Sequence, residues 1–339
     1  TDSAQIKGVG TTAISLIGTG GNGTSNNYGI ELTTASSISS TTGAITLDGT
    51  GGNGSSSYNE GIYLSTSTLK STTGTITLNG TGGSGTGFNH GTYLASSTID
   101  TTGGLIDITG TGGAGTESFN AGLRLGAGVS GDTIIQTTNS GSILLDGTAG
   151  GTGGTTDSNY GVSIVGGKSS VLTEDGNISI TGVGGAGNTS SSHGIYSTAN
   201  THFTSTGAGN LTLNGTGGTG IANSGIYMQG QGATTDIATG IITKIQTNTG
   251  DISMTGTGTN DAGAPSTNNH GIYLWNSTRL TGLSTTADIV LNGTAGNGTS
   301  SNRGIYLNGN GNDANAEAVT LIEANGGNIS LTGQGSGST

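Results

Sequence analysis

The stretch GAITLDGTGGNG at residues 43–54, followed by GIYL at residues 61–64, contains two patterns that recur through the whole chain. Apolar residues alternate with polar ones in both: Ile45 and Leu47 in the first, Ile62 and Leu64 in the second. A period of two is the pattern of a β-strand with one buried face. The stretch therefore predicts two short strands joined by a glycine-rich segment.

The first pattern occurs ten times in 339 residues, at intervals of 30 to 41 residues, and the second occurs nine times. A looser third element has the candidates Ile38, Leu69, Ile99, Ile134, Val171, Phe203, Ile245, Leu280 and Val319. A glycine lies two positions after each apolar pair of the first pattern. Asn or Asp precedes it in five units, and Asn-Gly and Asp-Gly supply the positive φ of a tight turn. We therefore expect these glycines to form structural corners: Gly18, Gly49, Gly80, Gly110, Gly147, Gly182, Gly215, Gly256, Gly293 and Gly333.

One repeat contains too few apolar residues to fold alone, but stacked repeats bury a continuous core. The sequence therefore predicts an all-β fold, a parallel and right-handed β-solenoid of about ten coils. Each coil has two to three short strands, with loops projecting at the corners. We expect a single continuous solenoid over residues 1–339, with partial coils at 1–10 and 328–339 and no caps. Uncapped coils expose strand edges, so we expect the ends to continue in a longer chain or to stack head-to-tail into a filament.

The composition excludes several functional classes. Gly, Thr and Ser number 72, 62 and 40, and the absence of Cys excludes disulfides and thiolate zinc sites. Seven basic residues against nineteen acidic ones give a net charge of −12, which excludes a basic footprint for nucleic acid. The longest apolar run is four residues, far too short to span a membrane. The seven basic residues do not gather at one repeat position, which argues against the clustered charges of a solenoid hydrolase or lyase.

Aromatic residues gather at the middle position of the second pattern, which alternation places outside the coil. One interpretation is a contact face for sugar or for a neighbouring rod. The other, which we favour, is an aromatic ladder that stiffens the sheet or lies beneath a loop. The candidate residues are Tyr63, Tyr93, Tyr196, Tyr227, Tyr273, Trp275 and Tyr306.

Two repeat positions have residue types that bind metals. His90, His193 and His270 precede the glycine of the second pattern, but they are too far apart to share an ion, and we interpret this position as a solvated corner. Asp251 and Asp288 occupy equivalent positions in neighbouring coils and are weak calcium candidates, although two exposed acids are the favoured interpretation. We therefore expect neither a metal nor a cofactor.

The repeat at residues 43–64 resembles repeat regions of very large bacterial surface proteins, above all the filamentous-haemagglutinin-like adhesins of cyanobacterial type. The resemblance is one of composition and repeat style over the whole chain, although the repeat here is longer and these 339 residues do not include the secretion domain expected at the family's N-terminus. It implies a β-solenoid exported to the cell surface for adhesion or for a fibrous coat.

These observations predict a non-catalytic, extracellular structural or adhesive protein of the bacterial cell surface. Its expected partners are copies of itself or neighbouring repeats, and surface glycans. The alternative is a glycan-binding adhesin that uses the outward Tyr column, and a polysaccharide hydrolase or lyase is less favoured.

Overall fold

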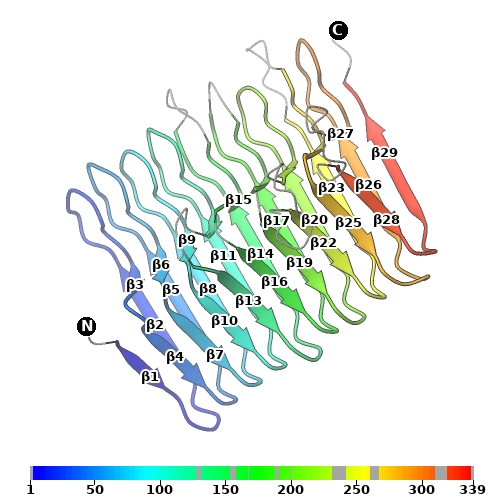
Figure 1. Ribbon diagram of the computed structural model, residues 1–339. Helices are drawn as coiled ribbons and strands as arrows, with labels where there is room; N and C mark the ends of the chain where they lie inside the picture. Colours follow the sequence, from blue (N-terminus) through cyan, green and yellow to red (C-terminus); the bar gives the residue numbers. More distant parts are fainter. Residues whose placement is uncertain are drawn as a thin grey trace.

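The computed structural model describes residues 3–126, 131–152, 158–166, 168–187, 191–198, 200–230, 242–259, 267–309 and 319–336, and they form a parallel β-solenoid. Its coils follow one another in a row from the N-terminal to the C-terminal end (Figure 1). Each coil adds one strand to each of three parallel sheets, which contain ten, ten and nine strands among these residues. No helix occurs in the described ranges, which accords with the high glycine content because glycine disfavours helix.

We name the sheets A, B and C in the order in which the chain passes through them. Sheet A contains β1 (Gln5–Lys7), β4 (Ser37–Ser40), β7 (Thr68–Ser71), β10 (Thr98–Thr101), β13 (Thr133–Thr137), β16 (Ser169–Thr173), β19 (Thr201–Ser205), β22 (Thr243–Thr247), β25 (Thr278–Gly282) and β28 (Leu321–Ala324). Sheet B contains β2 (Ile14–Thr19), β5 (Ile45–Thr50), β8 (Ile76–Thr81), β11 (Ile106–Thr111), β14 (Ile143–Thr148), β17 (Ile178–Val183), β20 (Leu211–Thr216), β23 (Ile252–Thr257), β26 (Ile289–Thr294) and β29 (Ile329–Gln334). Sheet C contains β3 (Ile30–Leu32), β6 (Ile62–Ser65), β9 (Thr92–Ala95), β12 (Leu123–Leu125), β15 (Val162–Ile164), β18 (Ile195–Thr198), β21 (Ile226–Gln229), β24 (Ile272–Trp275) and β27 (Ile305–Asn308).

The core is a set of aliphatic columns inside the three sheets. Ile45 and Leu47 of β5 are fully buried, and Ile45 pairs in register with Ile76 of the next coil. Ile62 and Leu64 of β6 are equally buried. Burial of this apolar surface is the main favourable term in the folding of the chain. The register shows that equivalent residues of successive coils stack directly above one another, as the repeat predicts.

For two of the core residues predicted in sheet A the prediction was wrong, because a residue slightly further along the chain faces inward instead. Ile135 is fully buried and pairs with Ile99, while Ile134 lies on the outer face. In the last unit Val319 is 47% exposed, and Ile322 is instead the residue that pairs with Leu280 and packs against the core. Each unit has two adjacent apolar residues in its sheet A strand, Ile134–Ile135 and Leu321–Ile322, so alternation alone did not define which one faces inward.

The ten predicted corner glycines are not corners. They lie inside the strands of sheet B, and none of them has a positive φ. A Cβ atom on Gly49 would lie 2.2 Å from the carbonyl oxygen of Gly61, the residue that precedes β6. Glycine is therefore required at nine of these positions, from Gly18 to Gly293, because the backbones of sheets B and C approach closely at the end of the sheet B strand. At Gly333 an added Cβ atom would lie 3.2 Å from its nearest neighbour, the Ile305 nitrogen.

The loops that join sheet B to sheet C, which we call the B–C loops, stand out together along one edge of the solenoid (Figure 1). Successive B–C loops are bonded to one another, since the amides of Gly52, Gly83 and Gly113 donate to the carbonyls of Asn27, Asn59 and Asn89 in the preceding coil. The loops of neighbouring coils are therefore stacked in layers like the strands. The longest coils contain insertions, and the larger part of each insertion lies outside the described residues. The insertions are at 230–242, 261–269 and 308–318.

A column of asparagines runs through the bases of the B–C loops, and the sequence analysis missed it. Its members lie two residues before the glycine of the second pattern: Asn27, Asn59, Asn89, Asn120, Asn159, Ser192, Asn223, Asn269 and Asn302. Asn59 and Asn89 are fully buried, and the Asn59 amide donates to Asn89 Oδ1 at 2.8 Å. Buried amides need hydrogen-bond partners, and here the neighbouring coil supplies them.

In the described ranges, no helix has the length and apolar character needed to cross a membrane.

Candidate functional site

The outward tyrosines of sheet C form a ladder of rings along the solenoid. Tyr63 and Tyr93 pair in register, with ring centroids 5.2 Å apart. Tyr273 and Tyr306 stack at 4.6 Å and 19°. Tyr196, Tyr227 and Tyr273 continue the column, with one perpendicular contact of 88° between the last two. Ring-to-ring contact covers much of each aromatic face, which matches the favoured interpretation of a ladder along the sheet.

Two tyrosines that the sequence analysis did not select complete this ladder. Tyr28 packs on Tyr63 at 5.2 Å, and Tyr160 stacks on Tyr196 at 4.2 Å. Both precede the glycine of the second pattern, the position that the sequence analysis interpreted as a solvated corner and did not include in the tyrosine column. Tyr160 continues the ladder in the coil where the sheet C position is Ser163, which is buried. The signal was present in the sequence as Asn-Tyr-Gly at residues 27–29 and 159–161.

The three histidines lie in a buried column, and the prediction of a solvated corner was wrong. His90, His193 and His270 are 1%, 3% and 1% exposed. The Nδ1 of His193 accepts the Ser224 amide at 3.0 Å, and the Nδ1 of His270 accepts the Arg303 amide at 3.2 Å. Each ring therefore has its hydrogen on Nε2 and is neutral. Burial lowers the pKa of His193 to about 3 and that of His270 to about 4, and nearby Arg303 also lowers the latter.

In the N-terminal half, large rings from the B–C loops cover the face beside this histidine column. Tyr58, Phe88 and Phe119 stack on one another at 5.1 Å and 4.9 Å. All three have left-handed backbone, with φ of 69°, 56° and 66°, which costs free energy for side chains other than Gly, Asn and Asp. The stacked rings offset that cost by their mutual contact and by covering the buried side chains of Glu60 and His90 beneath them. We call this part the covered half.

Beneath these rings the covered half contains a cluster of ionisable groups. Glu60 is 1% exposed, and burial raises its pKa to about 8, while nearby Arg124 acts in the opposite direction. The His90 Nδ1 accepts the Ala121 amide at 3.1 Å, and its Nε2 is buried without a protein partner. Burial, and then the charge of Arg124, hold the His90 pKa well below its ordinary value. The Arg124 guanidinium also lies 5.3 Å from the Tyr93 ring centroid.

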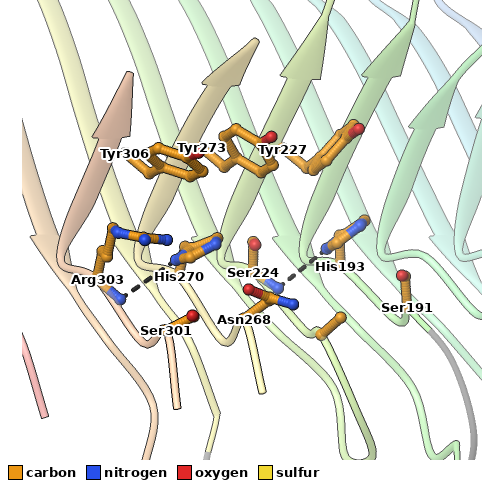
Figure 2. Close-up of a pocket in the computed structure, with 11 residues that line it drawn as sticks. Ser191, His193, Ser224, Tyr227, Asn268, His270, Tyr273, Ser301, Arg303 and Tyr306 are labelled. Atoms are coloured by element: carbon orange, nitrogen blue, oxygen red, sulfur yellow. Dashed lines mark hydrogen bonds between the residues drawn. The ribbon is translucent and has the colours of Figure 1, made fainter. Parts of the chain in front are cut away.

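In the C-terminal half, small residues replace the covering rings, and a groove of about 430 Å³ opens (Figure 2). Figure 2 shows its three rows: tyrosines on one side, His193, Ser224, His270 and Arg303 along the middle, and small residues opposite. Ser191, Ala222, Asn268 and Ser301 occupy the loop position that Tyr58, Phe88 and Phe119 occupy in the covered half. We call this part the open half. Its lining offers hydroxyl, amide and imidazole groups beside aromatic edges.

The other candidate residues lie apart from the groove. Trp275 is half-buried and stacks against Tyr273 with centroids 6.2 Å apart, at 17°. Asp251 Oδ1 accepts the Asp288 amide at 2.9 Å, and Asp288 Oδ1 accepts the Asn328 amide at 2.7 Å. These acids therefore bond the turns of successive coils together. Among the described residues, no group of three or more His, Asp or Glu side chains is arranged to hold a metal ion.

Comparison of the chain with protein-family models, with curated proteins and with solved structures finds no match. The resemblance to filamentous-haemagglutinin-like proteins implies a β-solenoid built from repeats, and this fold is the part of the resemblance that the structure shows.

Proposed function

We propose that this chain is a non-catalytic, extracellular structural and adhesive β-solenoid of a bacterial cell surface, part of a longer fibrous chain or of a head-to-tail fibre. The observation that carries the proposal is the in-register stacking of all three sheets through the described residues. Each coil contacts only its neighbours, so the fold makes a long and stiff surface from one repeated set of contacts. Such a surface suits a spacer or a fibre, with adhesion through the outward columns.

Electron microscopy and surface labelling of the native protein test this role. We expect rods or fibres of constant width, and antibodies against the chain should bind intact cells. Native material that forms only compact particles, or that becomes accessible only after the cells are lysed, would contradict the proposal.

The open half supports a second function, the binding of a saccharide. A concave site with several polar groups beside apolar surface is typical of small-ligand binding. Tyr227, Tyr273 and Tyr306 supply ring edges, and the Nε2 hydrogens of His193 and His270 can donate to sugar hydroxyls. Because the ladder already covers much of each ring face, we expect recognition to depend on hydrogen bonds to the hydroxyls more than on stacking.

Filling the groove tests this second function. The variant Ala222→Phe/Asn268→Phe copies the rings of the covered half at two positions that already have left-handed backbone, with φ of 60° and 63°. We expect at least a tenfold loss of affinity for any saccharide that a glycan array shows to bind the wild-type protein. Tyr63→Phe, in the covered half, is the matched control and should bind normally. If the filled variant binds as well as the wild type, the groove is not the site.

We assign no catalysis to the chain because of where its acids lie. The charge of Glu31 adds to the raised pKa of buried Glu60, and neither of these acids lines the groove. The charge of Asp146 adds in the same way to the raised pKa of Asp107, with burial as the larger cause. Both side chains point outward from the sheet B strands β11 and β14, and neither lines the groove of Figure 2. Glycoside hydrolysis needs two carboxyl groups on either side of a bound sugar. Incubation with polysaccharides should therefore release no reducing ends.

A further inference from the structure

Three basic side chains stack in successive coils on the outer face of sheet A. His202 of β19 pairs in register with Lys244 of β22, and Lys244 pairs with Arg279 of β25. The expectation that basic residues do not gather at one repeat position was wrong, because coils of unequal length hide this alignment in the sequence. Strands in a sheet are about 4.8 Å apart, so the three groups form a short row, which we call the basic column.

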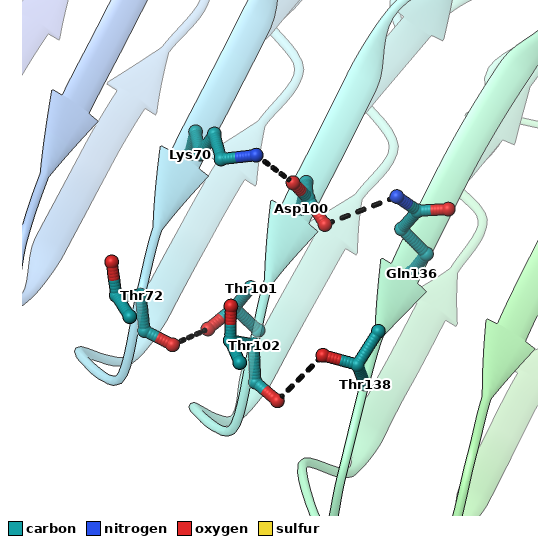
Figure 3. A network of polar contacts seen from close by, with 7 residues as sticks. All are labelled: Lys70, Thr72, Asp100, Thr101, Thr102, Gln136 and Thr138. Atoms are coloured by element: carbon teal, nitrogen blue, oxygen red, sulfur yellow. Dashed lines mark hydrogen bonds and ion pairs between the residues drawn. The ribbon is translucent and has the colours of Figure 1, made fainter.

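The same face of sheet A also contains a basic residue that is neutralised. The Lys70 Nζ lies 2.6 Å from Asp100 Oδ2, and Asp100 Oδ1 accepts a hydrogen bond from Gln136 Nε2 at 3.1 Å (Figure 3). This is the one ion pair among the described residues. It shows how the solenoid neutralises a cation by placing an acid in the next coil.

The basic column has no such acid beside it. Its neighbours two residues along the same strands are Thr204, Gln246 and Thr281, all uncharged, and they stack in register. Glu323 follows Thr281 in the next coil, and no ion pair forms between it and Arg279 among the described residues. Like charges in register on neighbouring strands are destabilising. An unneutralised row in a chain of net charge −12 therefore points to an anionic ligand.

The side chains of the basic column are held close to the sheet. All three are half-buried, and the Nε of Arg279 is buried without a protein partner. Burial lowers the pKa of Lys244, and burial followed by the charges of Lys244 and Lys168 lowers the pKa of His202. The lowered pKa of His202 favours the neutral form of its imidazole, beside the two basic side chains of the row. Partly dehydrated cations interact more strongly with an anion than fully exposed ones do.

We propose that the basic column binds an acidic, linear polysaccharide with its chain running along the solenoid axis. One sugar of an extended chain is about as long as the spacing between coils, so carboxylate or sulfate groups can meet successive cations. The hydroxyl and amide groups of Thr204, Gln246 and Thr281 lie beside the row and can bond to sugar hydroxyls. This surface is separate from the groove in the open half, and it names an anionic partner for the adhesive role.

The geometry favours a polysaccharide over a nucleic acid. In a duplex the phosphates of one strand advance by about 3.4 Å per nucleotide along the helix axis, which does not match a spacing of about 4.8 Å along the solenoid axis. Proteins that bind single strands stack the bases on aromatic side chains. The only aromatic ring on the outer face of the described strands β19, β22 and β25 is that of His202, since Phe203 of β19 is fully buried in the core.

The experiment compares two variants that each remove positive charge from sheet A. Binding of polygalacturonate and of dextran sulfate is measured by biolayer interferometry, with neutral dextran as the negative probe. We expect Lys244→Gln/Arg279→Gln to weaken polyanion binding at least tenfold and to make it less sensitive to salt. Lys70→Gln, which removes a cation already paired with Asp100, should change affinity less than twofold. Circular dichroism melting of each variant verifies that it is folded.

Three results would overturn the proposal. The first is wild-type affinity in the folded double variant, and the second is an equal loss in Lys70→Gln, which would show a general charge effect. The third is competition by single-stranded DNA at the affinity of polygalacturonate, which would assign the column to nucleic acid. The groove variant Ala222→Phe/Asn268→Phe should bind polygalacturonate normally, so failure of this proposal and failure of the saccharide groove are distinguishable.

Discussion

The covered and open halves of the sheet C face have the same backbone arrangement and differ in one loop position. Phe88 and Phe119 cover the histidine column in the covered half, whereas Ala222 and Asn268 leave it open to a groove of about 430 Å³. The backbone at this position is left-handed in both halves. The comparison shows that a repeat keeps its fold while a single side-chain position decides whether its surface is closed or able to bind.

The asparagine column differs between the halves in a related way. In the first five coils the column is a chain of side-chain hydrogen bonds. Each amide donates to the Oδ1 of the Asn in the next coil, at 2.7 to 3.1 Å, and the donors are Asn27, Asn59, Asn89 and Asn120. At Ser192 this chain of amides is interrupted, and beyond it the backbone amides of Ser192, Asn223 and Asn269 donate to the next Asn Oδ1. The Asn223 Nδ2 is buried without a protein partner. The column is therefore more fully bonded in the covered half.

The largest effect is expected from breaking that column. Asn89→Ser removes two buried hydrogen bonds, the one from Asn59 Nδ2 to Asn89 Oδ1 and the one from Asn89 Nδ2 to Asn120 Oδ1, although Asn59 Nδ2 keeps the carbonyls of Ser56 and Ser84 as acceptors. Each lost hydrogen bond costs up to about 1.5 kcal/mol. We expect a loss of about 3 kcal/mol in unfolding free energy, measured by denaturant titration. Asn223→Ser is the comparison variant: its Nδ2 has no protein partner to lose, so only the bond that Asn223 Oδ1 accepts from the Ser192 amide is removed, and we expect a loss of about 1.5 kcal/mol. Equal losses would contradict the difference between the halves.

A smaller effect is expected from the buried acid of the covered half. The folded protein holds the proton of Glu60 up to about pH 8, whereas the ordinary pKa is 4.5. The folded state therefore binds more protons than the unfolded state in this range, and stability is lost as the pH rises towards 8. Relative to Glu60→Gln, the wild type should lose roughly 2.5 kcal/mol between pH 6 and pH 8, at about 1.4 kcal/mol per pH unit.

The comparison between wild type and variant is needed because the buried histidines act in the opposite direction. Their lowered pKa values make stability fall as the pH drops below about 6.5. That contribution is common to both proteins and cancels in the difference. Parallel curves of stability against pH for wild type and Glu60→Gln would show that Glu60 is ionised in the folded state at neutral pH.

The smallest effect is expected from opening the covered half. Phe88→Ala removes three ring contacts, the stacked ones with Tyr58 and Phe119 and an edge contact with His90, and aromatic pairs contribute about 0.5–1.5 kcal/mol each. We expect a loss of about 2 kcal/mol, together with a rise in the pKa of His90 as water reaches its ring. Histidine NMR titration measures that rise, and the pKa of His193 in the same protein serves as the internal control. An unchanged His90 would show that the rings do not seal the cluster.

Much of the fold could be predicted from the alternation of apolar residues. Ile45, Leu47, Ile62 and Leu64 are in the core as expected, because period-two patterns report which side of a strand is buried. The prediction was wrong where several apolar residues are adjacent, as at Ile134 and Ile135. The Tyr column was located correctly for the same reason, since Tyr63 and Tyr93 alternate with buried residues and pair in register.

The candidate site could be predicted only in part. Alternation does not apply in the B–C loops, so the burial of His90, His193 and His270 depends on how the loops stack. The asparagine column was visible as Asn-x-Gly in eight of nine units. Its meaning required the hydrogen bonds between coils. The basic column was hidden because unequal coil lengths separate Lys244 from Arg279 by a different interval than His202 from Lys244.

The sequence by itself determined the strands, the inward residues and the stacking of repeats, since each follows from local alternation and from the recurrence of one unit. Only the tertiary structure decided which sheets meet closely at the sheet B glycines, which loop residues cover the histidines and which cations share a row. The row of cations and the stacked covering rings arise between coils, from contacts of residues about thirty or more positions apart, whereas sheets B and C meet within one coil, as at Gly49 and Gly61. Their distances depend on register and loop length, which local pattern does not encode.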